Sequence, residues 1–143
     1  MSNCVLLQSD SKPLPYGYRW FVENKLVNLR PWYFITEQST SDAFRREFIK
    51  ETSDPNPSKV KDLQPFAMVG GNDDVAGFAI HAGRVSNEVV VVHLTWSGRS
   101  EFEGFPGMTR YADIWEWFAD CVIGEMKHVA ENEEAYYQRQ GGR

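Results

Sequence analysis

The chain has 143 residues, with 15 Lys and Arg against 20 Asp and Glu, for a formal net charge of −5. Nine Phe, six Tyr and five Trp supply enough apolar surface for one core, which excludes an intrinsically disordered chain. The two cysteines, Cys4 and Cys121, exclude a disulfide-stapled miniprotein. No apolar run approaches the length of a membrane helix, and the first residues lack the pattern of a secretory signal. We therefore expect a single cytoplasmic domain over residues 1–143 that does not enter a membrane.

Charge is distributed unevenly along the chain. Residues 1–61 carry nine basic and seven acidic groups, whereas residues 62–134 carry four basic and thirteen acidic groups. Such an acidic half disfavours nucleic-acid binding, because that binding depends on neutralising phosphates with Lys and Arg. The negative charge either attracts a basic partner or only keeps the protein soluble, and composition does not separate these two explanations.

The first third of the chain predicts mixed elements. Residues 9–17 are expected to form a loop, since Pro13 and Pro15 lack a backbone donor. Residues 18–29 fit either a short amphipathic helix or a strand hairpin with a turn at 24–25. Residues 32–35 have the composition of a buried strand. A helix is predicted from Ser39, with Ser39 as N-cap and Asp42 in a capping box, to about residue 52. Phe44 and Phe48 share one face of this helix, and Arg45, Arg46, Glu47 and Lys50 are expected off that face. Residues 53–58 predict a surface loop.

From residue 63 onwards the pattern indicates strands. Residues 65–69 and 75–81 flank a turn at 70–74, and a hairpin turn at 82–83 leads to a strand at 88–96. A loop over 97–107 is expected to place Phe102 and Phe105 in the core. A long helix from about Tyr111 to Tyr136 follows, with a loose tail at 138–143.

Motifs for catalysis are sparse. The sequence has no Gly-x-Ser-x-Gly elbow and no phosphate-binding loop. His81 and His93 could be neighbours across a hairpin, but the histidine and cysteine spacing fits no zinc site, and we expect no metal and no cofactor. Cys121 lies on the apolar face of the last helix, which favours a packing role over that of a nucleophile. Catalytic residues are therefore not expected.

Several motifs occur in an order that resembles the SUKH superfamily, named after Syd and the fungal cell-wall-synthesis regulators. The resemblance covers about residues 60–122 and, more weakly, residues 15–35. Its motifs are Leu63-Gln64-Pro65-Phe66-Ala67, the turn at 70–74, the strand at 75–80, Gly83-Arg84-Val85, Phe102-Glu103-Gly104-Phe105 and Ile114-Trp115-Glu116-Trp117-Phe118.

The resemblance implies a single α+β domain in which helices pack around a twisted mixed, mostly antiparallel sheet. It also implies a non-enzymatic protein-binding function, of the kind found in bacterial immunity proteins that neutralise a cognate toxin, often a nuclease. Combined with the acidic charge, it predicts that a basic toxin domain is the protein partner. The residues expected to form the acidic binding surface are Asp73, Asp74, Glu101, Glu103, Asp113, Glu116 and Asp120, with Trp96 and Trp115 as possible aromatic anchors.

Two alternatives stay open. The same domain could be a general adaptor or scaffold of the cell-wall-regulator type, which binds a cellular protein. It could also be a small enzyme with an unrecognised site, for which a cleft with a perturbed carboxylate and a histidine would be the signature.

Overall fold

The computed structural model describes residues 6–53, 59–71, 73–94 and 107–140. Its centre is a six-stranded sheet in the order β3-β4-β5-β6-β7-β8, and each neighbouring pair is antiparallel. The strands are β3 Asn28–Leu29, β4 Trp32–Phe34, β5 Leu63–Val69, β6 Asp74–His81, β7 Arg84–His93 and β8 Met108–Tyr111. A separate hairpin pairs β1 Gln8–Ser9 with β2 Lys12–Pro13. The predicted α+β class is confirmed, although no parallel strand pair occurs within the described ranges.

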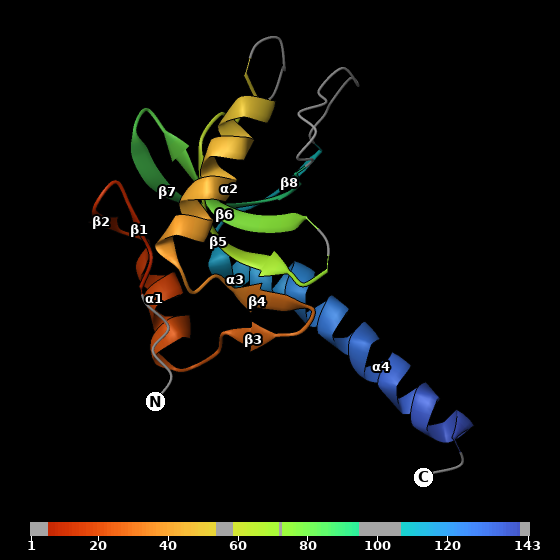
Figure 1. Cartoon of the computed structure of the whole chain (residues 1–143). Coiled ribbons are helices and arrows are strands. Elements are labelled where there is room, and N and C mark those ends of the chain that lie inside the picture. The colour runs from red at the N-terminus through yellow and green to blue at the C-terminus, as the bar shows by residue number, and fades with distance from the viewer. Residues whose placement is uncertain (1–5, 54–58, 72, 95–106, 141–143) are drawn as a thin grey trace.

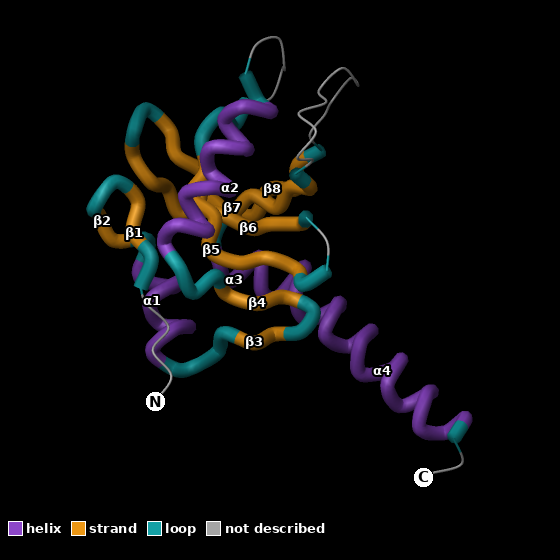
Figure 2. Tube along the Cα trace, in the orientation of Figure 1, coloured by secondary structure: helices purple, strands orange, loops and turns teal. Residues whose placement is uncertain are grey.

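Helices cover both faces of this sheet. They are α1 Tyr16–Glu23, α2 Gln38–Glu51, α3 Ile114–Trp117, the π-helical turn η1 Phe118–Val122, and α4 Ile123–Arg139. Figure 1 shows α2 in front of the sheet, α3 behind it and α4 leading away from the body. The tube in Figure 2 shows that α3, η1 and α4 form one continuous helical rod.

Aromatic side chains fill the core on the α1 and α3 side. The ring of Phe66 in β5 stacks on Phe78 of β6 at 4.7 Å and meets Trp117 of α3 edge-on at 5.1 Å. Tyr18 of α1 stacks on Phe34 of β4 at 5.9 Å, and its hydroxyl accepts a 3.0 Å hydrogen bond from a buried backbone N–H. Aromatic contacts of this kind add to area burial, so this cluster fixes the helices on the sheet.

The predicted strands and turns of the second half are confirmed where the structure describes them. Ala82 and Gly83 have φ angles of 53° and 78°, which matches the two-residue hairpin turn expected between β6 and β7. Strand β7 has β8 on its far side, while β5 and β6 hold the centre of the sheet. Phe102 and Phe105 lie outside the described residues.

Short elements in the first half differ from the prediction. Residues 18–29 follow the helix alternative as far as Glu23, where α1 ends, and the hairpin alternative is wrong, because β3 at Asn28–Leu29 pairs with β4 and not with residues 18–22. The expected loop at 9–17 contains the β1–β2 hairpin, whose turn residues Asp10 and Ser11 have φ angles of 52° and 68°. Two-residue strands carry too little periodicity to be detected, which explains the missed hairpin.

The helix boundaries also need correction. The N-cap of α2 is Glu37 rather than Ser39, and Asp42 forms no capping box because its carboxylate accepts hydrogen bonds from Gln38 and Gln64. Tyr111 belongs to β8, and the last helix begins at Ile114. Helix α4 continues to Arg139, so positions 138 and 139 are helical and not part of a loose tail.

Candidate functional site

The residues predicted to form an acidic binding surface fall into separate groups. Glu101, Glu103 and Trp96 lie outside the described residues. Asp73 and Asp74 are partly exposed at the start of β6. Asp113 and Glu116 lie at the start of α3, and Asp120 is exposed in η1. These positions divide the remaining acids between the two ends of the α3–η1 segment.

The first group surrounds the predicted anchor Trp115. Asp113 is the N-cap of α3, and its Oδ1 accepts a 2.9 Å hydrogen bond from the backbone N–H of Glu116. The Glu116 carboxylate accepts in return from the backbone N–H of Ala112. These two acids therefore stabilise the helix start as well as contributing negative charge to the surface.

Trp115 itself belongs to an exposed aromatic patch, which we define as Trp20 and Trp115, and both rings contact the ring of Phe21. The Trp115 ring lies 5.5 Å from Trp20 and 5.0 Å from Phe21, yet the side chain is 47% exposed. Trp20 is 36% exposed, whereas Phe21 is buried beneath them. The sequence alone gave no sign that Trp20 joins Trp115, because residues 18–29 fitted both a helix and a hairpin.

The second acidic group surrounds Tyr111 of β8 and Cys121 of η1. Asp74, Asp120 and Glu125 act electrostatically on Tyr111 and Cys121 from three different elements. Burial raises the pKa of Tyr111 to about 12, and the surrounding negative charges add to this shift. Burial and the charge of Glu125 also raise the pKa of the Cys121 thiol. Cys121 is half-buried and stays protonated near neutral pH, as befits a packing residue.

Glu125 was not among the predicted acids. Its Oε1 accepts a 2.6 Å hydrogen bond from the indole N–H of Trp32, which is itself buried in β4. This contact joins the rod of α4 to the sheet. Only a prediction of the sheet order could have placed Trp32 beside the last helix.

The two strand histidines are not neighbours. His81 lies next to the hairpin turn, where its Nε2 is 3.0 Å from Glu88 of β7. His93 lies at the opposite end of the same strand pair, with Nδ1 2.8 Å from Asp74. The expectation that they meet across the hairpin is wrong, because the strands that carry them are paired almost along their full length.

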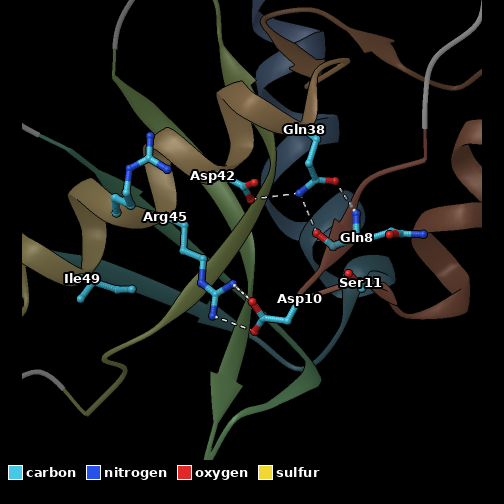
Figure 3. Close-up of a pocket in the computed structure, with 8 residues that line it drawn as sticks. Gln8, Asp10, Ser11, Gln38, Asp42, Arg45 and Ile49 are labelled. Atoms are coloured by element: carbon cyan, nitrogen blue, oxygen red, sulfur yellow. Dashed lines mark hydrogen bonds and ion pairs between the residues drawn. The ribbon is translucent and has the colours of Figure 1, made fainter.

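A polar hollow of about 450 Å³ lies between the β1–β2 hairpin and α2 (Figure 3). Gln8 and Gln38 exchange two hydrogen bonds of 2.8 Å across it. Arg45 forms the floor and donates to both carboxylate oxygens of Asp10, at 3.1 and 3.2 Å. The hairpin is thereby fastened to the helix.

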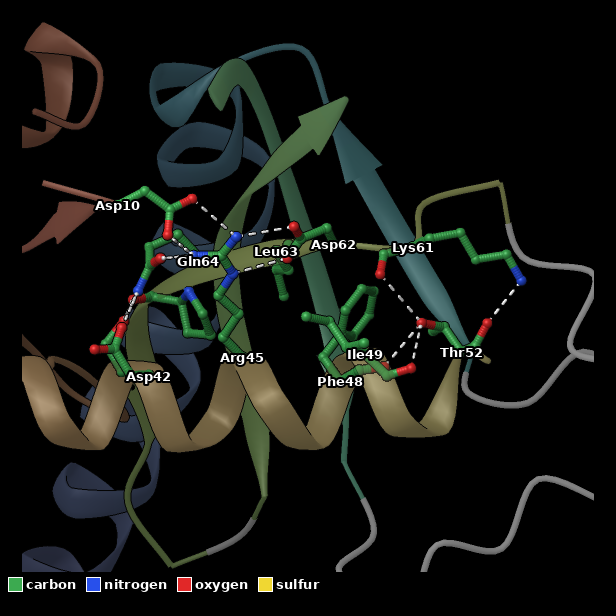
Figure 4. Close-up of polar contacts among 12 residues, drawn as sticks. Asp10, Asp42, Arg45, Phe48, Ile49, Thr52, Lys61, Asp62, Leu63 and Gln64 are labelled. Atoms are coloured by element: carbon green, nitrogen blue, oxygen red, sulfur yellow. Dashed lines mark hydrogen bonds and ion pairs between the residues drawn. The ribbon is translucent and has the colours of Figure 1, made fainter. Parts of the chain in front are cut away.

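Arg45 uses all five of its N–H donors in this arrangement. Besides the two bonds to Asp10, it donates two of 2.9 Å to Asp62 and one of 3.2 Å to the buried amide of Gln64 (Figure 4). These contacts raise the pKa of Arg45 above its already high ordinary value, chiefly through Asp62. Because every N–H donor of this guanidinium is used, it has none to offer an anionic ligand. The residues of the hollow therefore connect the hairpin to α2 and do not form an anion-binding site.

Two carboxylates on α2 are buried against the sheet. Glu47 is 8% exposed and Glu51 is 1% exposed. This corrects the sequence-based placement of Glu47 off the buried face. Oε2 of Glu47 has no hydrogen-bond partner within the described part of the chain. Glu47 precedes the buried Phe48 and so lies at the edge of the apolar face of α2. In the folded protein the buried surface of the helix extends to this edge.

Among the described residues, no three His, Cys, Asp or Glu side chains are placed to share a metal ion. Over the same residues, no helix has both the length and the apolar character needed to cross a membrane.

Comparison of the chain with models of known protein families, with curated proteins and with solved structures found no match.

Proposed function

We propose that this protein is a non-enzymatic binding domain of the immunity type, which neutralises a cognate bacterial toxin by covering a basic surface on it. The observation that carries the proposal is the half-exposed Trp115, which contacts the tilted ring of Trp20 and is flanked by Asp113 and Glu116. Large aromatic side chains exposed on a rigid helix are typical of the residues that dominate binding energy in protein interfaces.

Charge supports the same kind of partner. Residues 62–134 contain thirteen acidic and four basic groups, and Asp113, Glu116 and Asp120 all belong to one helical segment. A nuclease must attract phosphates, so its active face is basic, and an acidic protein approaches that face faster than a neutral one. The motif order that resembles the SUKH superfamily is consistent with this proposal.

The test is co-expression with the toxin that is encoded beside the gene, followed by calorimetric titration of the two purified proteins. We expect protection of the host cell and a one-to-one complex. Replacing Trp115 by Ala should weaken the complex by a factor of about 30 or more, the cost of losing an interface hot spot. Tyr136→Ala is the matched control, because Tyr136 is an equally exposed aromatic residue on α4, outside the patch.

Two results would argue against this function. Undiminished killing by the toxin in the presence of the protein would remove the immunity proposal. A toxin complex that is unaffected by Trp115→Ala would remove the aromatic patch as its contact surface. Specific binding to a purified cellular protein, without toxin binding, would instead favour the adaptor alternative.

A further inference from the structure

A small cavity of about 200 Å³ opens beside the exposed aromatic patch. It lies between the first turn of α1, strand β7 and the start of α3, and its walls include Gly17, Asn87, Asp113 and Trp115. The three elements come from distant parts of the sequence. The packing of the fold therefore creates the cavity, and no local motif encodes it.

Gly17 allows α1 and α3 to approach closely at this point. A Cβ atom on Gly17 would lie 2.7 Å from Cγ2 of Ile114 and 3.3 Å from Nε1 of Trp115. Both distances are shorter than ordinary van der Waals contacts. The absence of a side chain thus places the indole of Trp115 against the N-terminal turn of α1 as one wall of the cavity.

Two polar groups of the cavity, on Asp113 and Asn87, have oxygen atoms free to accept hydrogen bonds. Asp113 is the only charged residue among its described walls. One carboxylate oxygen of Asp113 accepts the backbone N–H of Glu116, and the other makes no hydrogen bond within the described part of the chain. The side-chain amide of Asn87 on β7 likewise makes none there. A ligand that donates hydrogen bonds and carries positive charge would bind the second carboxylate oxygen of Asp113 and the amide oxygen of Asn87.

We propose that this cavity receives a basic side chain of the partner, with arginine favoured over lysine. The inference rests on the proposed function, since it specifies how the toxin is recognised. A planar guanidinium stacks on an indole and donates in a fork to a carboxylate, whereas an ammonium group is more strongly hydrated and acts as a point charge. Trp115 then supplies the stacking surface, Asp113 the charge and Asn87 an additional acceptor.

The pocket can be tested without the toxin. The probes are N-acetyl-arginine amide, N-acetyl-lysine amide and the uncharged isostere N-acetyl-citrulline amide, each titrated into the full-length ¹⁵N-labelled protein. The expected result is a shift of the Trp115 indole N–H and of the Asn87 side-chain amide signals, with arginine binding more tightly than lysine and citrulline weakest. Equal shifts with arginine and citrulline, or no shift at these two residues up to the solubility limit, overturn the proposal.

Asp113→Asn is the decisive variant. Asn is as good an N-cap as Asp, so the start of α3 should persist while the charge is lost. We expect the arginine probe to bind about tenfold more weakly, because a hydrogen bond to a charged group is replaced by a neutral one. Glu131→Gln is the charge-matched control on exposed α4 and should leave probe binding unchanged. Unaltered probe binding by Asp113→Asn contradicts the assignment.

The same variants separate this inference from the proposed function. If the toxin binds Asp113→Asn as tightly as the unchanged protein, the arginine pocket is wrong while the immunity function stands. If the toxin binds neither protein, the proposed function fails, whatever the probes show.

Discussion

Arg45 and Asp62 are joined by two hydrogen bonds of 2.9 Å, from Nε to Oδ1 and from Nη2 to Oδ2. The same guanidinium holds Asp10 at the turn of the β1–β2 hairpin, and its side chain is only 17% exposed. One residue of α2 therefore fastens the N-terminal hairpin to the segment that leads into β5. Partial burial makes this contact stronger than an ordinary surface ion pair.

Replacing Arg45 by Met should lower the free energy of unfolding by about 2–3 kcal/mol, because several charge-assisted hydrogen bonds are lost together and the buried Gln64 loses a donor. Arg45→Lys should recover only part of this loss, since an ammonium group cannot reproduce the fork. Urea unfolding measures both effects. The adjacent and exposed Arg46 is the control, and Arg46→Met should change stability by no more than about 0.5 kcal/mol. Similar losses at Arg45 and Arg46 would contradict this account.

Glu88 should make stability depend on acid pH. A hydrogen bond from Arg110, with a smaller contribution from His81, holds the pKa of Glu88 below its ordinary value of 4.5. The folded state therefore binds this proton less readily than the unfolded state does. The stabilisation is complete above pH 4.5 and is lost as the pH falls through the lower pKa of the folded protein.

The measurement is urea unfolding at a series of pH values from neutral to acid. The variant Glu88→Gln should lose less stability over the acid range than the unchanged protein. Glu131→Gln provides the control, as it removes an equal charge from an exposed helix position. Identical pH profiles for Glu88→Gln and the unchanged protein would show that the Arg110 contact does not contribute.

Gly17 and Gly124 should respond to alanine in opposite ways. Gly17→Ala places a Cβ atom 2.7 Å from Ile114 and should cost about 1–3 kcal/mol through overpacking at the α1–α3 contact. At Gly124 in α4 a Cβ atom meets no atom within 4 Å, so Ala should stabilise the protein by up to about 1 kcal/mol through helix propensity. Thermal unfolding of the two variants compares them directly. A stabilising Gly17→Ala would disprove the close approach of the two helices.

Glu47 should be replaceable with a gain in stability. Its Oε2 is buried and has no hydrogen-bond partner among the described residues, so the folded state loses the hydration of this oxygen without compensation. Glu47→Met keeps a similar length and should raise the free energy of unfolding by about 1–2 kcal/mol. Chemical denaturation of this variant and of the exposed Glu134→Met gives the comparison. A loss of stability in Glu47→Met alone would indicate that the carboxylate has a stabilising role.

More of the secondary structure was predicted from the sequence in the second half of the chain than in the first. Strands β5, β6 and β7 were predicted because apolar runs were separated by glycine turns at 70–71 and 82–83. The N-terminal hairpin and β8 were missed, since strands of two to four residues show no clear alternation. Glu47 was misplaced because helical spacing identifies the centre of a buried face better than its margins.

Of the candidate site, the sequence identified Trp115 as a possible anchor and Asp113 and Glu116 as acids beside it. Nothing in the sequence indicated that the ring of Trp20 contacts the ring of Trp115, or that Asn87 shares a cavity with both Asp113 and Gly17. The pairing of Asp74 with His93 was equally hidden, since it depends on the register of β6 against β7.

Composition, charge and local periodicity thus predicted the main strands and helices along the chain and the acidic character of residues 62–134, whereas the α+β class was implied by the resemblance to the SUKH superfamily. Tertiary structure alone decided which acids help form a helix start, which gather around Tyr111 and Cys121, and which border the exposed indole. The physical reason is that side-chain periodicity reports contacts within one element, whereas a binding surface is assembled from elements whose spacing depends on core packing. Here that packing runs through the aromatic cluster around Phe66, which sets α1 and α3 side by side.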